Sequence, residues 1–378
     1  MEHKVKIVIG ANYGDEGKGL MSRYFTKQFK EDGRRPITVL HNGSAQRGHT
    51  ADYEDGSRHV FHNFGAGAKD GSATYYASTF LAHPMDFYRE VQELGYCPNV
   101  YADPRCVVVT PWDMLADHII EDYIAVQSGA REYGSCGYGT WSATDRIRVR
   151  PVIAFTIHDY MTTDYRIIAT TMKSWVEDRL KMFGINLDLV PHWKPHFDPE
   201  SPQYRNTYAN FYDDIRFFLK NVKLKHFDDL WKEADSFIFE GAQGLLLDKD
   251  RESIWTTTSK TGLFNPYMLL DKHRDFCAEV CYVSRAYVTR HGVGPLDFEV
   301  DKAELGDNIE DRTNVFNNFQ GDLRYANLSK HYLRDAILSD YMLADERYDQ
   351  TLALTHCNEH DTYGGNYRSY SPTEVIKT

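Results

Sequence analysis

The chain has 378 residues, a formal net charge of −12, and 42% hydrophobic, 14% aromatic and 26% charged residues. This composition excludes a disordered, collagen-like or coiled-coil protein. The acidic balance excludes a generally basic surface for nucleic acid and leaves room only for a local pocket that binds a small anion. Because no apolar run approaches ~18 residues and the start carries no signal-peptide pattern, we expect a cytoplasmic protein with no nucleic-acid or membrane partner.

Short apolar runs that end in glycine-rich or polar turns predict buried strands. The predicted strands cover residues 5–10, 37–40, 107–110, 236–240, 280–289 and 350–355. We predict a helix at 20–27, helical stretches within 155–190 and a surface excursion over 191–208. Strand ends that deliver polar loops are typical of an open α/β sheet. We therefore expect an α/β fold: a single large domain, residues 1–378, around a mostly parallel central sheet with P-loop-like glycine loops and smaller α/β excursions.

The six cysteines are scattered and contain no CxxC pair. Cys277 and Cys281 are four residues apart, which supplies only half of a zinc site. We therefore expect reduced structural thiols.

The first glycine loop follows the first predicted strand and carries Gly14, Gly17 and Gly19 around Lys18. A strand, such a loop and a helix present backbone N–H groups and a helix N-terminus to a phosphate. The loop is not a Walker A motif, because Asn12 stands where that motif has glycine and Lys18 is not followed by Ser or Thr.

Two carboxylates, Asp15 and Glu16, lie inside the same loop. A carboxylate repels phosphate unless a cation or a proton lies between them. The pair therefore indicates either Mg²⁺ or a carboxylate that takes a proton from the substrate.

Further small-residue loops occupy 43–50, 134–139 and 239–248. Their order resembles the adenylosuccinate synthetase family. The family motifs WGDEGKG, NAGHT, EGAQG with a following LLD, Y-x-T-R-x-G-x-G-P and TKLD match residues 13–19, 46–50, 240–248, 287–295 and 355–358.

The resemblance implies a ligase that joins the amino group of L-aspartate to C6 of a 6-oxopurine nucleotide, after a nucleoside triphosphate has phosphorylated the 6-oxygen. Asp15 matches the base that removes the N1 proton, and His49 matches the general acid or hydrogen-bond donor at O6 and the γ-phosphate. Gln243 matches the amide that orients the 6-oxygen.

The resemblance also implies binding residues. Mg²⁺ would be held by Asp15 and the carbonyl of Gly48. The triphosphate donor would be bound by Gly14, Gly17, Lys18, Gly19, Gly48, Thr50, Asn358, Ser369, Ser371 and Pro372. The monophosphate would be bound by Gln46, Ser135, Cys136, Thr258 and Arg150. Arg150 aligns with an arginine supplied by the neighbouring subunit, which implies a homodimer, although the alignment can slip to Arg146 or Arg148.

The sequence departs from the family at two substrate positions. Asn358 replaces the aspartate that reads guanine, and an amide can pair with adenine, so we expect ATP or dATP as donor. The four-arginine run is reduced to residues 321–324, in which Arg324 can still take the aspartate carboxylate. Asp322 stands where an arginine would meet the ribose, which favours a deoxyribose.

These departures resemble the phage branch of the family, which converts dGMP to N6-succinyl-2-amino-2′-deoxyadenylate for diaminopurine DNA. That branch has serine at the position of Asp15, so one feature points the other way. We rank dGMP above IMP as the acceptor. A nucleotide-binding switch or ATPase has no need of His49 or Gln243, and an inactive relative would not keep Asp15, Lys18 and Arg324 as well.

Overall fold

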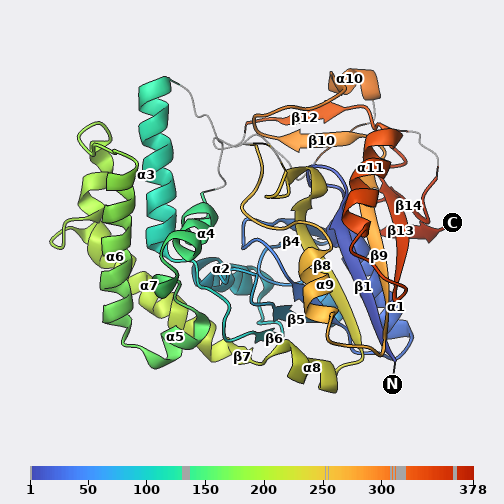
Figure 1. Cartoon of the computed structure of the whole chain (residues 1–378), viewed down its shortest axis with the longest axis horizontal. Coiled ribbons are helices and arrows are strands. Elements are labelled where there is room, and N and C mark those ends of the chain that lie inside the picture. The colour runs from blue at the N-terminus through green and yellow to red at the C-terminus, as the bar shows by residue number, and fades with distance from the viewer. Residues whose placement is uncertain are drawn as a thin grey trace.

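The computed structural model describes residues 2–129, 137–251, 253, 255–306, 309, 311, 321–360 and 364–378. A ten-stranded sheet runs through its centre (Figure 1). In spatial order its strands are β15 (Glu374–Lys377), β14 (Tyr367–Ser371), β13 (Tyr348–Thr355), β9 (Phe276–Arg285), β1 (His3–Gly10), β8 (Ser236–Gly244), β2 (Ile37–Leu40), β5 (Ala73–Tyr76), β6 (Val100–Ala102) and β7 (Val222–Leu224). Neighbouring strands are parallel except β14 and β15. The expected α/β class with a mostly parallel sheet is confirmed.

Two small antiparallel sheets accompany the central one. They contain β10 (Val288–His291), β12 (Leu323–Ala326) and β11 (Glu299–Val300), and β3 (His49–Asp52) with β4 (Arg58–Phe61). The α-helices are α1 (Lys18–Glu31), α2 (Pro84–Leu94), α3 (Pro111–Ser128), α4 (Thr140–Val149), α5 (Ile157–Thr162), α6 (Tyr165–Met182), α7 (Pro202–Asn221), α8 (Phe227–Glu233), α9 (Phe264–Leu270), α10 (Lys302–Leu305) and α11 (Lys330–Tyr341). Short 3₁₀ turns are η1 (Ala68–Asp70), η2 (Pro151–Ile153), η3 (Pro191–His196) and η4 (Leu245–Leu247). Of the helices described, none has the length and apolar content needed to cross a bilayer.

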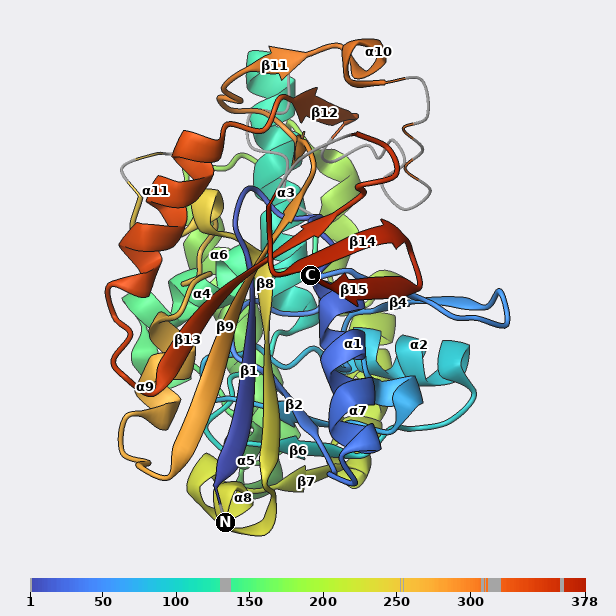
Figure 2. The same ribbon diagram turned by 90° about the vertical axis from the view of Figure 1, so that its right-hand side faces the viewer.

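Helix α1 covers one face of the sheet (Figure 2). Its Met21, Phe25 and Phe29 recur every four residues and pack with Val8 of β1 in one cluster. Ile7 of the same strand belongs to the cluster on the opposite face, because successive strand side chains alternate. The predicted helix at 20–27 is confirmed and is longer than expected.

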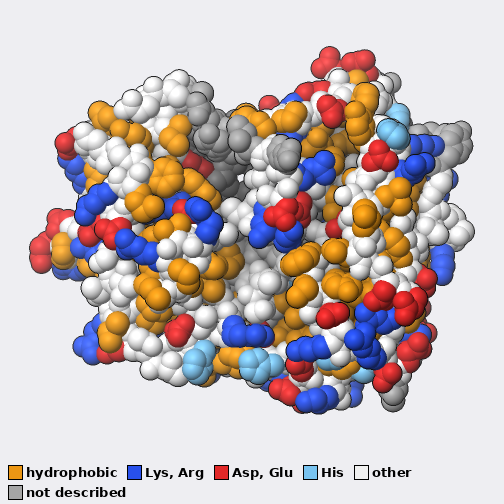
Figure 3. All heavy atoms as spheres, in the orientation of Figure 1, with side chains coloured by type: hydrophobic (Ala, Val, Ile, Leu, Met, Phe, Trp, Pro, Cys, Tyr) orange, Lys and Arg blue, Asp and Glu red, His pale blue; other side chains and the backbone are white. Residues whose placement is uncertain are grey.

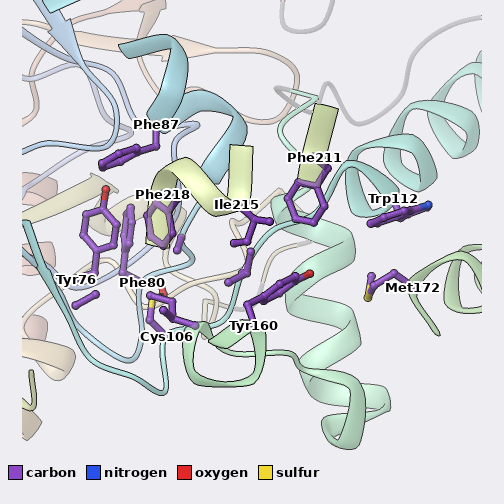
Figure 4. Packing of buried hydrophobic residues seen from close by; sticks show 14 of the residues in the cluster. Tyr76, Phe80, Phe87, Cys106, Trp112, Tyr160, Met172, Phe211, Ile215 and Phe218 are labelled. Carbon is purple, nitrogen blue, oxygen red and sulfur yellow. The ribbon is translucent and has the colours of Figure 1, made fainter. Parts of the chain in front are cut away.

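Helices α2, α3, α6 and α7 gather beside the β5–β6–β7 end of the sheet, on the left in Figure 1. Their core is rich in aromatic side chains (Figure 4). Phe87 meets Phe218 edge-on with ring centroids 5.1 Å apart, and Trp112 meets Phe211 at 5.7 Å. Such pairs add to the stabilisation that burial gives and fix how the helices pack.

Residues 107–110 do not form the predicted strand. Val107 and Val108 make only isolated bridges, to Thr156 and Ala82. No strand forms because helix α3 begins here. The Thr110 side chain accepts the N–H of Asp113, and the Asp113 carboxylate accepts the N–H of Thr110, which is therefore not available to a neighbouring strand.

The predicted strand at 280–289 is two strands, β9 and β10. Ala286 donates its N–H to the carbonyl of Thr355, the last residue of β13, so the parallel partner ends there and the chain leaves the sheet. The excursion at 191–208 is partly helical, since α7 begins at Pro202 behind the N-cap Ser201. A serine cap followed by proline was a helix signal in the sequence.

Candidate active site

The three glycine loops meet at the carboxyl ends of β1, β2 and β8, which lie at one edge of the sheet because these strands are parallel. The first and third loops touch so closely that a Cβ at Gly244 would lie 2.2 Å from the carbonyl oxygen of Asn12. A Cβ at Gly19 would lie 2.6 Å from the carbonyl oxygen of Thr50, beside the second loop. These glycines are required by the approach of the loops to one another.

Glu16 holds the first loop together from inside. One carboxylate oxygen accepts the N–H groups of Asn12 (3.0 Å) and Gly14 (2.8 Å), and the other forms an ion pair with Lys18 Nζ (2.7 Å). Both charged side chains are buried. The lysine and one of the amides expected to bind phosphate are therefore both held by the Glu16 carboxylate.

Asp15 presents its carboxylate beside this scaffold. Its backbone is left-handed, with φ 60°, and its side chain is about a third exposed. The imidazole Nε2 of His291 lies 3.5 Å from Asp15 Oδ2. An accessible carboxylate on a rigid loop can serve as a base or as a metal ligand, so the geometry permits both roles.

His49 is paired with Glu240 of β8, with Nδ1 and Oε1 2.7 Å apart. The same Nδ1 also lies 2.5 Å from Nη2 of Arg47, so this nitrogen faces both a carboxylate, which only accepts, and a guanidinium, which only donates. Burial and the neighbouring Arg47 lower the pKa of His49 to about 4. Although burial opposes ionisation of Glu240, Arg47 and His49 lower the pKa of this carboxyl to about 2. These shifts favour a neutral His49, which can act as a general acid only in a form that carries a proton on Nε2.

Gln243 lies at the end of β8 in a left-handed conformation, with φ 63°. Its neighbour Ala242 exchanges two hydrogen bonds with the Asn42 side chain, at 2.8 and 3.0 Å, which locks the third loop onto the second. The Gln243 Oε1 atom is buried and has no hydrogen-bond partner among the described residues. An unpaired buried amide oxygen suits the predicted contact with a substrate group.

Two of the residues predicted for the monophosphate, Gln46 and Thr258, contact the N-terminal half of α4. Thr140 donates to Gln46 Oε1 (3.2 Å), and Thr144 donates to Thr258 (3.3 Å). Ser135 and Cys136 lie outside the described residues. The structure thus brings Gln46 and Thr258 to one helix start, where backbone N–H groups favour an anion.

The three candidate arginines differ in accessibility. Arg146 is fully buried and bound by Asp113 and two carbonyl groups, so it cannot reach another subunit. Arg148 and Arg150 are exposed and form surface ion pairs with Asp145 and Asp178. Surface pairs of this kind are easily exchanged for another anion.

The residues predicted to face the donor base lie at the ends of β13 and β14. Cys357 donates its N–H to the Ser369 carbonyl (3.0 Å), so the segment that ends in the exposed Asn358 lies against the end of β14, which Pro372 follows. Thr355 donates to the carbonyl of Glu16 (2.8 Å) and joins this region to the first loop.

Arg324 of β12 lies opposite Arg290 of β10 in the antiparallel register. The Arg290 guanidinium stacks over Tyr13 of the first loop, 4.7 Å from the ring centroid. The predicted aspartate-binding arginine is therefore held next to the loop that carries Asp15.

Several residues around these side chains were not expected to belong to the site. Three of them, Glu240, Arg47 and His291, lie within the recognised motifs, so their place in a motif was a usable signal. Arg285 lies outside these motifs and carries no local signal, because its partner Asp15 is far away in the sequence.

A sequence model of the adenylosuccinate synthetase family matches residues 7–326 of this chain. The chain belongs to the adenylosuccinate synthetase family. All three loops described above fall within the matched region.

Curated relatives agree with this membership. The chain is 27% identical over 309 residues to an adenylosuccinate synthetase of Geotalea daltonii, covering 79% of this chain and 66% of the relative. It is 25% identical over 315 residues to that of Clostridium botulinum, covering 81% and 68%. The chain thus spans about two thirds of the length of the family members it matches.

Two solved structures share the fold. Fully ligated adenylosuccinate synthetase of Plasmodium falciparum superposes with a TM-score of 0.68 at 18% identity, covering 94% of this chain and 77% of that one. Succinoaminodeoxyadenylate synthetase of cyanophage S-2L, bound to dGMP and dATP, superposes with a TM-score of 0.65 at 16% identity, covering 100% and 96%.

The two ligands predicted for magnesium are of the chemical type that this ion prefers. A carboxylate at Asp15 and a main-chain carbonyl at Gly48 are the hard oxygen ligands that Mg²⁺ prefers, usually together with substrate phosphates. Within the described ranges no group of three or more His, Cys, Asp or Glu side chains is placed to hold a metal.

Proposed function

We propose that this protein is a carbon–nitrogen ligase that condenses L-aspartate with C6 of a 6-oxopurine nucleotide. The observation that carries the proposal is the meeting of the Asp15 loop, the His49–Glu240 pair and Gln243 at one edge of the sheet. A binding switch needs a phosphate loop alone, whereas this set supplies a base, an imidazole and an amide around one position.

In this mechanism Asp15 removes the N1 proton of the purine, and the negative charge moves to O6, which attacks the γ-phosphate and releases the nucleoside diphosphate. Lys18 and the loop amides balance the charge of the phosphates, and bound Mg²⁺ supplies further charge neutralisation there. His49 in a form that carries a proton on Nε2 donates a hydrogen bond to O6 and the γ-phosphate, while Gln243 orients the 6-oxygen. The aspartate amine then displaces the phosphorylated oxygen at C6, with Arg324 holding the aspartate carboxylate.

The proposed donor is ATP or dATP and the proposed acceptor is dGMP, which gives N6-succinyl-2-amino-2′-deoxyadenylate. Asn358 supports the adenine donor, and Asp322, an exposed carboxylate in place of a ribose-binding arginine, supports the deoxyribose. The cyanophage protein of the same fold was bound to this pair of nucleotides. The alternative acceptor is IMP, which is favoured by the retained Asp15.

The deciding experiment is a product assay by mass spectrometry. Purified protein receives aspartate, Mg-ATP and either dGMP or IMP, with each co-substrate omitted in turn. The proposal expects a succinylated nucleotide and ATP consumption only when all three substrates are present, with dGMP the better acceptor. ATP hydrolysis that is equal without aspartate or acceptor supports a nucleotide-binding switch instead, and a tenfold preference for IMP makes the protein an ordinary adenylosuccinate synthetase.

A further inference from the structure

The main chain of the candidate base, Asp15, is held by hydrogen bonds from residues that lie far away along the chain. Asp15 has φ 60°, a left-handed conformation that non-glycine residues adopt only where surrounding contacts hold it. Its carbonyl accepts a hydrogen bond of 2.6 Å from Arg285 Nε, and the next carbonyl, that of Glu16, accepts one of 2.8 Å from Thr355. The two donors stand at the ends of β9 and β13, so the sheet itself fixes the loop.

Arg285 uses all three nitrogens of its guanidinium. Besides the bond to Asp15, Nη2 forms an ion pair with Asp311 (2.8 Å) and Nη1 donates to the Tyr287 hydroxyl (3.1 Å). The side chain is buried, and although burial alone would lower it, the pKa of Arg285 is raised by Tyr287, Asp311 and Asp15. A lysine has one nitrogen and cannot satisfy three partners that diverge in this way.

A second arm leads from this arginine to the donor segment. The Tyr287 hydroxyl accepts from Arg285 and donates to Glu359 Oε2 at 2.6 Å. Glu359 follows Asn358, the residue proposed to face the donor base. One hydrogen-bonded chain therefore joins the Asp15 main chain to the segment that reads the donor.

We propose that Arg285 is a positioning residue that holds the strained main chain of Asp15 in its working geometry, and that Tyr287 connects this support to the donor segment. The inference rests on the proposed function. A small displacement of a base from its proton is costly: about 1 Å reduces turnover by about 10²-fold.

The test compares Arg285→Lys with Arg23→Lys. Arg23 on α1 is a matched control, because it is also buried, donates to a main-chain carbonyl (Asp52, 2.6 Å) and pairs with carboxylates. We expect Arg285→Lys to lower kcat by about 10- to 100-fold with the KM for acceptor and aspartate unchanged. Arg23→Lys should lower the melting temperature to a similar extent and leave kcat unchanged. Equal kcat in the two variants overturns the proposal.

Tyr287→Phe separates the two arms, because it leaves the bond from Arg285 to Asp15 in place. We expect a higher KM for the triphosphate donor with kcat nearly unchanged. A fall in kcat as large as that of Arg285→Lys contradicts the division into two arms.

Hydrogen exchange gives a readout that needs no turnover. In the nucleotide-free protein, the peptide covering residues 11–19 should exchange faster in Arg285→Lys than in Arg23→Lys or wild type, because only the first variant releases the loop. Equal protection in all three overturns the inference even if the wild type is an active ligase. Absence of any succinylated product from the wild type, with faster exchange in Arg285→Lys, overturns the proposed function and leaves the role of Arg285 standing.

Discussion

Glu299 holds the guanidinium of Arg324 in a forked ion pair, with Nε 2.7 Å from Oε1 and Nη2 2.5 Å from Oε2. The third nitrogen donates to the carbonyls of Gly292 (3.2 Å) and Gly294 (2.8 Å). Arg324 is the residue proposed to bind the substrate aspartate. A carboxylate of the chain itself thus pairs with the guanidinium that is proposed to bind the substrate's carboxylate.

Removing this internal competitor should improve aspartate binding. Glu299→Gln keeps the shape and loses the charge, and since exposed ion pairs contribute about 0–1 kcal/mol, we expect the KM for aspartate to fall by up to about fivefold. Steady-state kinetics with aspartate varied measure this. Arg324→Gln should instead raise that KM by about tenfold or more. An unchanged KM in both variants would remove Arg324 from the aspartate site.

Asp15→Asn and His49→Asn should each lower kcat by about 10²-fold or more, as expected for groups that move or hold a proton in the transition state. Melting curves of both variants should resemble that of the wild type. Asp15 is partly exposed, and the His49→Asn variant retains a side-chain amide donor toward Glu240. Near-normal turnover in a folded variant would assign that residue a passive role.

Donor choice should follow the side chain at 358. ATP or dATP should support turnover far better than GTP in the wild type, and Asn358→Asp should shift preference toward GTP, because a carboxylate accepts from guanine N1–H and N2–H together. Competition between the two triphosphates in one reaction measures the ratio directly. A wild type that prefers GTP refutes the assignment of Asn358.

Arg150 tests the proposed homodimer by complementation. Asp15→Asn and Arg150→Ala subunits are each inactive in their own dimers, but a hybrid has one site with both residues intact. A 1:1 mixture that exchanges subunits should therefore recover about a quarter of wild-type activity. If Arg148→Ala complements Asp15→Asn and Arg150→Ala does not, Arg148 is the arginine that reaches the neighbouring subunit. No recovery of activity with either variant refutes a shared site.

Stability should fall as the pH is lowered from about 6.5 toward 4. Burial lowers the pKa of His83 to about 4, and its Nδ1 caps α2 by accepting the N–H of Asp86 (3.2 Å). Above the ordinary value of about 6.5 both folded and unfolded states are neutral. Below it only the unfolded chain takes up the proton, which costs up to about 1.4 kcal/mol per pH unit for each such histidine.

Melting temperatures between pH 7.5 and 4.5 test this prediction. His83→Asn keeps a cap acceptor without a titrating group, so its melting temperature should depend less steeply on pH. His158→Asn, at an exposed position of α5, should leave the slope unchanged. Equal slopes in all three proteins would exclude His83 as a source of acid sensitivity.

The fold class, the three glycine loops and the family could all be inferred from the amino-acid sequence. Their signals are local: a short apolar run, a glycine where the backbone must turn, and a polar residue at a fixed offset in one loop. The net charge of −12 also predicted that the surface is not generally basic. On the face shown in Figure 3, acidic and basic side chains are interspersed with no dominant basic area. The single-domain organisation stays a prediction.

Contacts between distant segments became visible only in the folded chain. The strand expected at 107–110 is replaced by a helix cap, and the one expected at 280–289 divides where its neighbour β13 ends. A buried ion pair with Asp113 keeps Arg146 inside the protein, so Arg148 and Arg150 are the remaining candidates for the proposed subunit contact. The neutral state of His49, the support of Asp15 by Arg285 and the capture of Arg324 by Glu299 depend on partners 25 to 270 residues away along the chain. No local pattern reports such contacts, because their burial and charge arise only once the sheet has brought the segments together.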